Sequence, residues 1–389
     1  MEPLTKLMLF AARNAFRNRR RAVATMMSIS MSLFLISTLK TLLDKLESPS
    51  PMPNAARRAV IRNATSLGVS IPISYRDRIR RIDGIEAVAA AQWLGGVYRS
   101  PANFFAQYAV DADRLFDIYP ETHADSEEQK DAFIHNRTAA LAGTLLRARF
   151  GWKVGDRITL KGAALPVDVE TTIVGFVSGG GNDGNFYLHW DYLNELFPEN
   201  ATQTFFIMAK DAGDLPAISE TIDAMFANSS APTKTEAESV FIVEVMSMWG
   251  NVRLFVLSIS GAVLFTMILV ASNTMAMSIR QRTAETAVLR TLGFAPAHVI
   301  GMMIAESSVI CLGGGLLGSF GARCLYAGID VKALTLGAIH SFEVSWHTVI
   351  LSASISLAVA IFSTLIPACN AIRLPIAVAI RRNGEVLSS

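Results

Sequence analysis

Cysteine is scarce in this sequence, and its positions exclude one class of extracellular protein. The three cysteines, Cys311, Cys324 and Cys369, all lie in or beside long apolar runs. The large polar region between residues 44 and 250 has none, so it cannot be a scaffold held together by disulfides. We interpret the three cysteines as small hydrophobic residues of membrane helices.

Charge is also sparse. Charged residues make up 17% of the chain and hydrophobic residues 51%. This balance is typical of a membrane protein that carries a sizeable soluble part. The formal net charge is only +2, so the places where basic residues gather are more informative than the total. Nothing in the sequence favours nucleic acid as a partner.

The motifs of several enzyme classes are missing. No G-x-x-x-x-G-K-[ST] motif occurs, so the chain is not expected to hydrolyse ATP itself. No Ser/His/Asp or Cys/His set is recognisable, and no catalytic residue is predicted. Gly179, Gly181 and Gly184 spell G-x-G-x-x-G, but the residues that follow, NFYLHW, indicate a strand where a dinucleotide site needs a helix. We interpret this segment as a flexible loop.

One acidic cluster has the residue types of a metal site. Its spacing matches no metal-binding pattern, and we interpret it as the exposed start of a helix. The cluster consists of His123, Asp125, Glu127, Glu128 and His135. The sequence therefore predicts no metal site.

Four uncharged runs are long enough to approach or cross the apolar core of a bilayer, which takes about 20 residues. They predict membrane helices over residues 22–43, 251–279, 299–328 and 344–372. A cleaved signal peptide is disfavoured for the first run, because the run is too long and no small-x-small cleavage site follows it.

Basic residues gather at the ends of these runs on one side. Residues 1–21 form an expected basic amphipathic helix, and residues 280–298 and 373–389 are also basic. By the positive-inside rule, both termini and residues 280–298 are expected in the cytoplasm. Residues 44–250 and the short loop 329–343 are then outside.

The outer region of residues 44–250 mixes helix and strand signals. Helices are expected at Tyr75–Ile82, Ser126–Phe150, Leu215–Asn228 and Ala237–Arg253, the last running into the second span. Strands are expected at Ala87–Gln92, Gly96–Tyr98, Arg157–Lys161, Thr171–Val177 and Phe205–Ala209. The fold class predicted is four transmembrane helices plus a mixed α+β domain, or two small subdomains, inserted between the first and second spans.

Residues 280–298 predict a short amphipathic helix on the cytoplasmic face. Ala284, Ala287, Val288 and Leu292 recur at helical spacing, and Gly293 follows as a C-terminal stop. Its charged residues Arg282, Glu285 and Arg290 are expected on the outer face. The alternative is a solvated interfacial loop.

Two further features lie in the third span. Glu306, at its cytoplasmic edge, is expected to pair with a nearby arginine; the alternative is a proton or substrate path. Gly314-x-x-x-Gly318 allows a helix to approach closely, either within the bundle or across a dimer.

Three motifs in order around four spans resemble MacB/FtsX-type ABC transporter permeases. AARNAFRNRRRAVATMMSIS (Ala11–Ser30) is similar to the family's start, and IPACNAIRLPIAVAIR (Ile366–Arg381) to its end. GWKVGDRITL followed by TTIVGFV resembles a MacB-like periplasmic core domain. In Asn273–Ser307 the matching residues are Arg282, Thr283, Glu285, Arg290, Leu292, Gly293 and Glu306. The sequence departs from the family at Gln281, usually glutamate, and at Thr286-Ala287, commonly Ile-Gly.

The resemblance implies a non-catalytic permease subunit in a bacterial inner membrane, as a homodimer. A separate ABC ATPase, which binds ATP and Mg²⁺, would push on a coupling helix containing Arg282, Thr283, Glu285, Arg290, Leu292 and Gly293. Motion would reach the outer domain through extensions of the first two spans, around Leu39–Glu47 and Glu244–Leu257.

The transported substrate stays open. An outer domain of about two hundred residues, with the pattern at Gly155–Leu160 and Val174–Val177, resembles the MacB and Lol types more than the smaller FtsX type. Of these we favour efflux with a periplasmic adaptor and an outer-membrane channel. The alternatives are Lol-type lipoprotein release and FtsX-like activation of a periplasmic partner. A sensor without transport is disfavoured, because few residues follow the last span to form an output domain.

Overall fold

The computed structural model describes residues 14–47, 54–247, 252–335 and 342–373. These residues form two compact units, which are described separately. The helical unit comprises residues 14–45, 252–329 and 342–373, and the inserted domain comprises residues 46–47, 54–247 and 330–335. Most of the amphipathic helix expected over residues 1–21, the prolines at 49, 51 and 53, and the tail after Arg373 lie outside the described residues.

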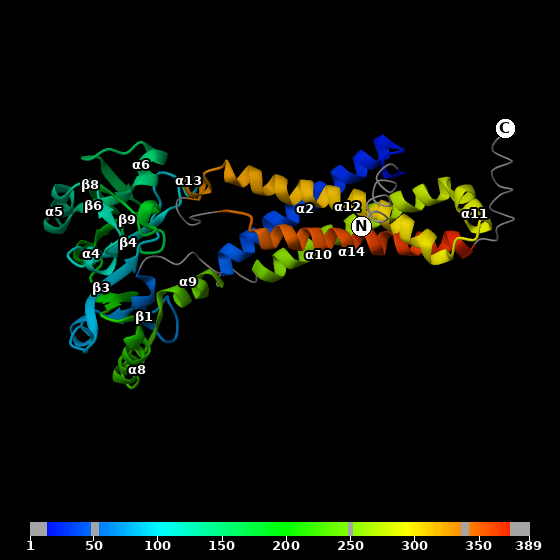
Figure 1. Cartoon of the computed structure of the whole chain (residues 1–389). Helices are drawn as coiled ribbons and strands as arrows, with labels where there is room; N and C mark the ends of the chain where they lie inside the picture. The colour runs from blue at the N-terminus through cyan, green and yellow to red at the C-terminus, as the bar shows by residue number, and fades with distance from the viewer. Residues whose placement is uncertain (1–13, 48–53, 248–251, 336–341, 374–389) are drawn as a thin grey trace. The chain divides into compact units, whose positions relative to one another are not determined.

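The helical unit contains four long helices (Figure 1), α2 (Arg19–Glu47), α10 (Val252–Gln281), α12 (Pro296–Ala327) and α14 (Trp346–Arg373). Each has a mean hydropathy between 1.7 and 2.5 over its most apolar window and is long enough to cross a membrane. The prediction of four membrane helices is confirmed, and each helix begins and ends within a few residues of the expected bounds.

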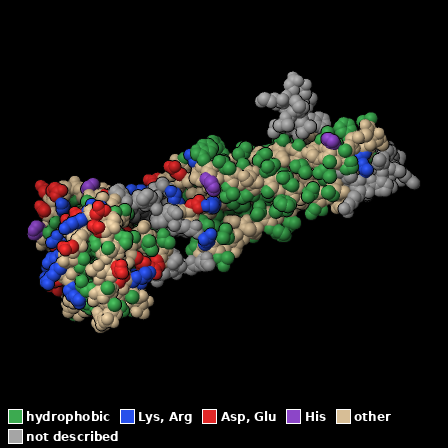
Figure 2. Space-filling view, turned by 60° about the horizontal axis from the view of Figure 1, so that its bottom comes forward, with side chains coloured by type: hydrophobic (Ala, Val, Ile, Leu, Met, Phe, Trp, Pro, Cys, Tyr) green, Lys and Arg blue, Asp and Glu red, His purple; other side chains and the backbone are tan. Residues whose placement is uncertain are grey.

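The outer surface of this bundle is apolar. Large side chains such as Met31, Phe255, Phe362 and Ile366 are each more than 60% exposed, and hydrophobic side chains cover much of the visible face of the helical unit (Figure 2). A soluble protein rarely exposes so large an apolar surface, whereas lipid chains cover it without cost. The surface therefore agrees with a location in a bilayer.

Small residues bring α12 against α2. A Cβ atom added at Gly318 would lie 2.2 Å from the carbonyl oxygen of Ser30, and one added at Gly314 would lie 2.7 Å from that of Met26. Both contacts are within one chain, so this Gly-x-x-x-Gly segment packs inside the bundle. Gly315, between them, faces Ser356 of α14.

We expect Gly318→Ala to destabilise the bundle by about 1–3 kcal/mol, because its methyl group overlaps backbone atoms that cannot move aside. Unfolding of the full chain in detergent measures this change. Gly321→Ala is the matched control, since a Cβ there meets no atom within 4 Å. Equal stability of the two variants would contradict the packing described.

The inserted domain is built on a ten-stranded sheet with the order β12-β1-β11-β3-β4-β9-β6-β8-β5, in which β7 also pairs with β8. Parallel pairing occurs between β4 and β9 and between β6 and β8, and the other pairs are antiparallel. The strands are β1 (Arg58–Asn63), β3 (Ile85–Trp93), β4 (Ala106–Val110), β5 (His123–Ala124), β6 (Ala139–Gly143), β7 (Arg157–Leu160), β8 (Val169–Ser178), β9 (Asn185–His189), β11 (Thr204–Ala209) and β12 (Thr233–Ala237). A small second sheet joins β2 (Ile71–Pro72) to β10 (Ala201–Thr202).

Helices cover the sheet and complete its apolar cores. Near β1, β3 and β11, the apolar side of α8 (Leu215–Phe226) packs with α3 (Tyr75–Ile79), and the rings of Tyr75 and Phe226 stack 3.9 Å apart. At the other end, α6 (Thr144–Phe150) closes an aromatic cluster around Trp152. The remaining helices are α4 (Leu115–Ile118), α5 (Glu127–His135), α7 (Trp190–Leu196), α9 (Glu238–Ser247) and α13 (Val331–Leu334).

The mixed α+β class is confirmed, and one sheet runs through the whole domain. Strands β3, β7, β8 and β11 and helices α3 and α8 lie where they were expected. Two expectations were wrong. Residues 126–150 form a helix, a strand and a second helix rather than one helix, and residues 96–98 make only an isolated bridge from Val97 to Lys161.

The missed strand, β6, differs from the expected helix for a physical reason. Its sequence, AALAG, consists mainly of residues that favour helix in isolation. All five residues are buried, with β8 on one side and β9 on the other, and this central position requires an apolar strand. Gly143 ends the strand where a Cβ atom would lie 2.0 Å from the carbonyl oxygen of Asp183.

Candidate functional site

The expected amphipathic helix of the cytoplasmic face is α11 (Thr283–Thr291). It ends in a Schellman motif, in which the Gly293 amide donates to the Arg290 carbonyl and the Phe294 amide to the Leu289 carbonyl. Gly293 has φ +92°, a conformation that glycine adopts without strain. Pro296 then occupies the first turn of α12.

Arg282 and Glu306 form a close ion pair. Arg282 Nη1 donates to Glu306 Oε2 at 2.5 Å, and Arg282 Nη2 donates to the carbonyl oxygen of Asn14 at 2.8 Å. The two charged side chains are only 18% and 12% exposed. Arg282 therefore differs from the outward position expected for it, because Glu306 at the edge of the bundle draws it inward. Glu306 has an arginine partner, the arrangement favoured from the sequence.

Two arginines of the N-terminal segment contact the same region. Arg17 Nη1 donates to Glu285 Oε1 at 2.7 Å, and Arg21 Nη1 donates to Gln281 Oε1 at 2.9 Å. In the sequence these arginines are recognisable only as part of a basic N-terminal segment. Together with the bond from Arg282 to Asn14, they join residues 14–21 to the turn before α11 and to the first turn of α11.

The two faces of α11 differ. Thr286 and Ala287 are buried, while Val288 and Leu292 are 51% and 71% exposed. The Thr283 hydroxyl donates to the Arg280 carbonyl at 2.9 Å, and Arg290 is half-buried. The departures from the family at Thr286-Ala287 thus lie on the inner face. The outward face presents Val288 and Leu292 beside the exposed Glu285, so the apolar positions do not share one inner face as expected.

A small cavity of about 110 Å³ lies beneath α11. Arg282 and Glu306 line it together with apolar side chains such as Met275, Leu289 and Met302. Space under the helix would let it tilt without first breaking a close-packed core. The cavity contains no recognisable set of groups for covalent chemistry among the described residues.

A double-mutant cycle on Arg282→Gln and Glu306→Gln is expected to give a coupling energy of about 2 kcal/mol, because each partner is largely removed from water. Unfolding of the full chain in detergent supplies the measurement. The Arg17–Glu285 pair is the matched control: its side chains are 63% and 54% exposed, so no measurable coupling is expected. Equal coupling energies in the two cycles would show that burial does not strengthen the Arg282–Glu306 pair.

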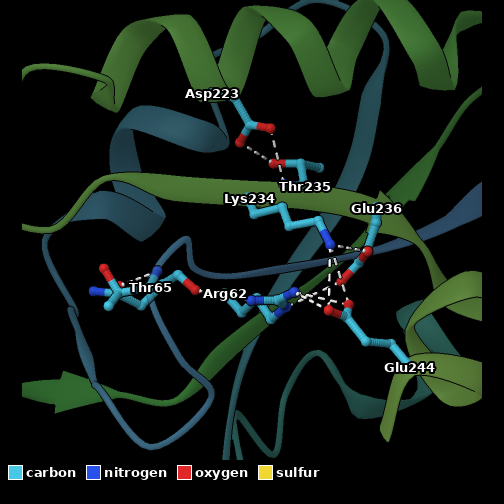
Figure 3. Close-up of polar contacts among 8 residues, drawn as sticks. Arg62, Thr65, Asp223, Lys234, Thr235, Glu236 and Glu244 are labelled. Carbon is cyan, nitrogen blue, oxygen red and sulfur yellow. Dashed lines mark hydrogen bonds and ion pairs between the residues drawn. The ribbon is translucent and has the colours of Figure 1, made fainter. Parts of the chain in front are cut away.

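A second polar site, in the inserted domain, holds α9 to the sheet (Figure 3). Arg62 of β1 donates through Nη2 to both carboxylate oxygens of Glu244 at 2.7 Å, and through Nε to Glu236 at 3.0 Å. Lys234 lies 2.9 Å from Glu236 and 3.1 Å from Glu244. Because Glu244 belongs to α9 and the other three residues to the sheet, this network ties the helix to the edge strands.

Arg58, four residues before Arg62, holds the start of the same helix. Residues i and i+4 of a strand share one face, so both arginines reach toward α9. Arg58 donates to Glu238 and to Glu121, each at 2.5 Å, and its side chain is fully buried. Burial opposes its charge, but the attraction of the two carboxylates prevails, and the pKa of Arg58 is raised. We call these contacts of Arg58 and Arg62 with α9 the α9 clamp.

The α9 clamp is expected to loosen only in strong acid. Hydrogen bonding with Glu236, Arg62 and Lys234 lowers the pKa of Glu244 to about 2. A depressed pKa stabilises the fold above the unfolded value, about 4.3, and the stabilisation is lost as the pH falls through the folded value. The difference in unfolding midpoint between the native chain and Glu244→Gln should therefore be constant above about pH 5 and shrink between about pH 4 and 2.

Glu199→Gln, at an exposed glutamate of the same domain, is the control and should follow the native profile throughout. A Glu244→Gln difference that already disappears near neutral pH would contradict the contacts of the α9 clamp.

Comparison with known families identifies the architecture. The family model of the MacB-like periplasmic core domain matches residues 22–225, just over half of the chain. The model of the FtsX-like permease C-terminal region matches residues 257–376. The chain belongs to the MacB/FtsX family of ABC transporter permeases. Permeases of this family are generally non-catalytic, and the C-terminal match includes α11, Arg282 and Glu306.

Individual relatives are distant. An uncharacterised ABC transporter permease of Methanocaldococcus jannaschii is 25% identical over 314 residues, which cover 76% of each chain. The extracellular domain of the transporter YknZ from Gram-positive bacteria aligns with a TM-score of 0.36 and 11% identity, covering 46% of this chain and 99% of that domain. The periplasmic region of MacB from Actinobacillus actinomycetemcomitans aligns with a TM-score of 0.35 and 13% identity. The alignment covers 54% of this chain and 98% of that region. The family assignment depends on the family models.

Proposed function

We propose that this MacB/FtsX-family permease is the membrane subunit of an ATP-driven complex, in which α11 receives motion from a separate ABC ATPase that holds ATP and Mg²⁺. The observation that carries the proposal is the exposed face of α11, which presents Val288 and Leu292 beside Glu285 on a short helix that Arg282 and Glu306 hold to the bundle at its start. Leu292 is 71% exposed there and Phe294, just beyond the helix, 42%. An exposed apolar patch with a charged border is typical of a docking site.

Motion of α11 has a defined route into the bundle. Glu306 links the turn before α11 to α12, and Arg17 and Arg21 link the region to the segment that begins α2. Because α2 continues as one helix to Glu47, a displacement at its cytoplasmic end is carried along a stiff rod. The extension expected at Leu39–Glu47 is helical, and the one at Glu244–Leu257 contains the end of α9 and the start of α10, with residues 248–251 outside the described part.

The proposed setting is a bacterial inner membrane with both termini in the cytoplasm and the inserted domain outside. The complex would contain two copies of this chain and two ATPases, and would expel a substrate through a periplasmic adaptor and an outer-membrane channel. The size of the inserted domain favours the MacB and Lol types over the smaller FtsX type, and efflux is the function that we propose. Lol-type lipoprotein release and FtsX-like activation of a periplasmic partner use the same membrane machinery and are the alternative outcomes.

Co-purification in detergent with the ATPase of the same operon tests the proposal. We expect Leu292→Asp to weaken the complex and its ATPase stimulation by about tenfold or more, since a carboxylate at the centre of an apolar contact is poorly accommodated. Leu196→Asp, at a 39% exposed leucine of the inserted domain, should leave both unchanged. A correctly folded chain that binds no ATPase, or a complex insensitive to Leu292→Asp, would refute the role of α11.

A further inference from the structure

A separate cavity of about 190 Å³ lies within the inserted domain, between one face of the sheet and α9. Its floor contains Ala89 and Ala91 of β3, and Phe241 and Ile242 of α9 contribute to its wall. Alternate residues of a strand face the same side, so two small side chains in a row on this face leave the space open. We propose that this cavity binds a compact organic cation.

Aromatic rings form much of the wall. Tyr108 and Tyr187 are register partners on the parallel strands β4 and β9, and their rings lie 6.3 Å apart at an angle of only 28°. Tyr119 and Phe206 form a second pair with centroids 6.0 Å apart, and Phe241 adds a fifth ring. The faces of such rings carry partial negative charge and attract cations within about 6 Å.

The charge beside the cavity has the matching sign. Glu238 lines the cavity, accepts from the Tyr119 hydroxyl at 2.9 Å and is bound by Arg58. Arg58 also pairs with Glu121, so one guanidinium faces two carboxylates. Glu121 Oε2 and Arg58 Nη2 are buried and have no hydrogen-bond partner among the described residues. A buried cluster with one formal negative charge in excess is costly, and a bound cation would compensate it.

The guanidinium of Arg58 already lies 4.7 Å from the centre of the Tyr119 ring. The site therefore includes one cation–π contact made by the protein's own side chain. The amides at the cavity are occupied: Asn182 donates to Thr122 and Asn185 donates to Tyr187. With these two amides paired, the aromatic rings and the carboxylate are the lining groups left to recognise a ligand, and an anion would meet repulsion from Glu238.

The size of the cavity limits the ligand. A volume of about 190 Å³ is below the roughly 300–1,000 Å³ of pockets for drug-sized molecules, so the cation must be compact. Because Glu238 and Phe241 belong to α9, a bound cation would contact the same helix that the α9 clamp holds. This site is a property of the inserted domain and does not depend on coupling to an ATPase.

Benzyltrimethylammonium is a suitable probe, and phenylmethanesulfonate, of similar shape and opposite charge, is the matched counter-probe. Calorimetric titration of the full chain in detergent, without an ATPase, should show one cation bound per chain in the millimolar range or tighter, and no binding of the anion. Equal binding of the two probes, or none of the cation, would overturn the proposal. Neither result bears on whether α11 binds an ATPase.

Substitutions then locate the bound probe. Tyr108→Leu should weaken cation binding by about tenfold, the effect of losing an aromatic face in a desolvated site. Tyr192→Leu is the matched control, because Tyr192 is also half-buried but packs against the aromatic cluster around Trp152. Ala89→Leu should abolish binding by filling the space. Binding that survives both Tyr108→Leu and Ala89→Leu in folded protein would place the cation elsewhere and refute the site.

Discussion

A charged group that leaves water must find a partner, and this constraint arranges the polar ends of both units. In the helical unit, Glu306 at the edge of the third span is neutralised by Arg282, which fixes the turn between α10 and α11. In the inserted domain, the buried Arg58 is neutralised by Glu238, which fixes the start of α9. In each case a strongly directional ion pair determines where a helix begins, and apolar packing then completes the contact.

The two sites have different tolerance to change. Around the α9 clamp several carboxylates and cations lie together, so the loss of one partner leaves others nearby. Glu244 stays ionised over the whole physiological pH range because its pKa is lowered. The Arg282–Glu306 pair has one carboxylate and one guanidinium, with Asn14 as a further acceptor. In the role that we propose for α11, few contacts are an advantage, since displacement of the helix then disrupts less.

The membrane architecture could be predicted from the sequence because bilayers impose a simple rule on composition. Soluble domains rarely contain uncharged runs of sufficient length separated by basic segments, and Gly293 and Pro296 indicated the end of α11 and the start of α12 through local backbone preferences. The fold of the inserted domain was harder to predict from the sequence. The residues of β6 favour helix locally, and only the neighbours β8 and β9, about thirty and forty-five residues later in the sequence, make them a strand.

The ion pairs of the inserted domain could not be predicted from local sequence either, because their partners also lie far apart in the chain. Arg62 and Glu244 are 182 residues apart, and Arg58 and Glu238 are 180 apart, so no periodicity relates them. One signal was available: β1, which lies between β11 and β12, carries two arginines on one face of the sheet. Buried arginines at such positions need carboxylate partners from elsewhere in the fold. The acidic residues of α9 satisfy this need. A helix recruited by buried charge in this way lies over the alanines of β3 without filling the space above them, which leaves the cavity that we propose as a cation site.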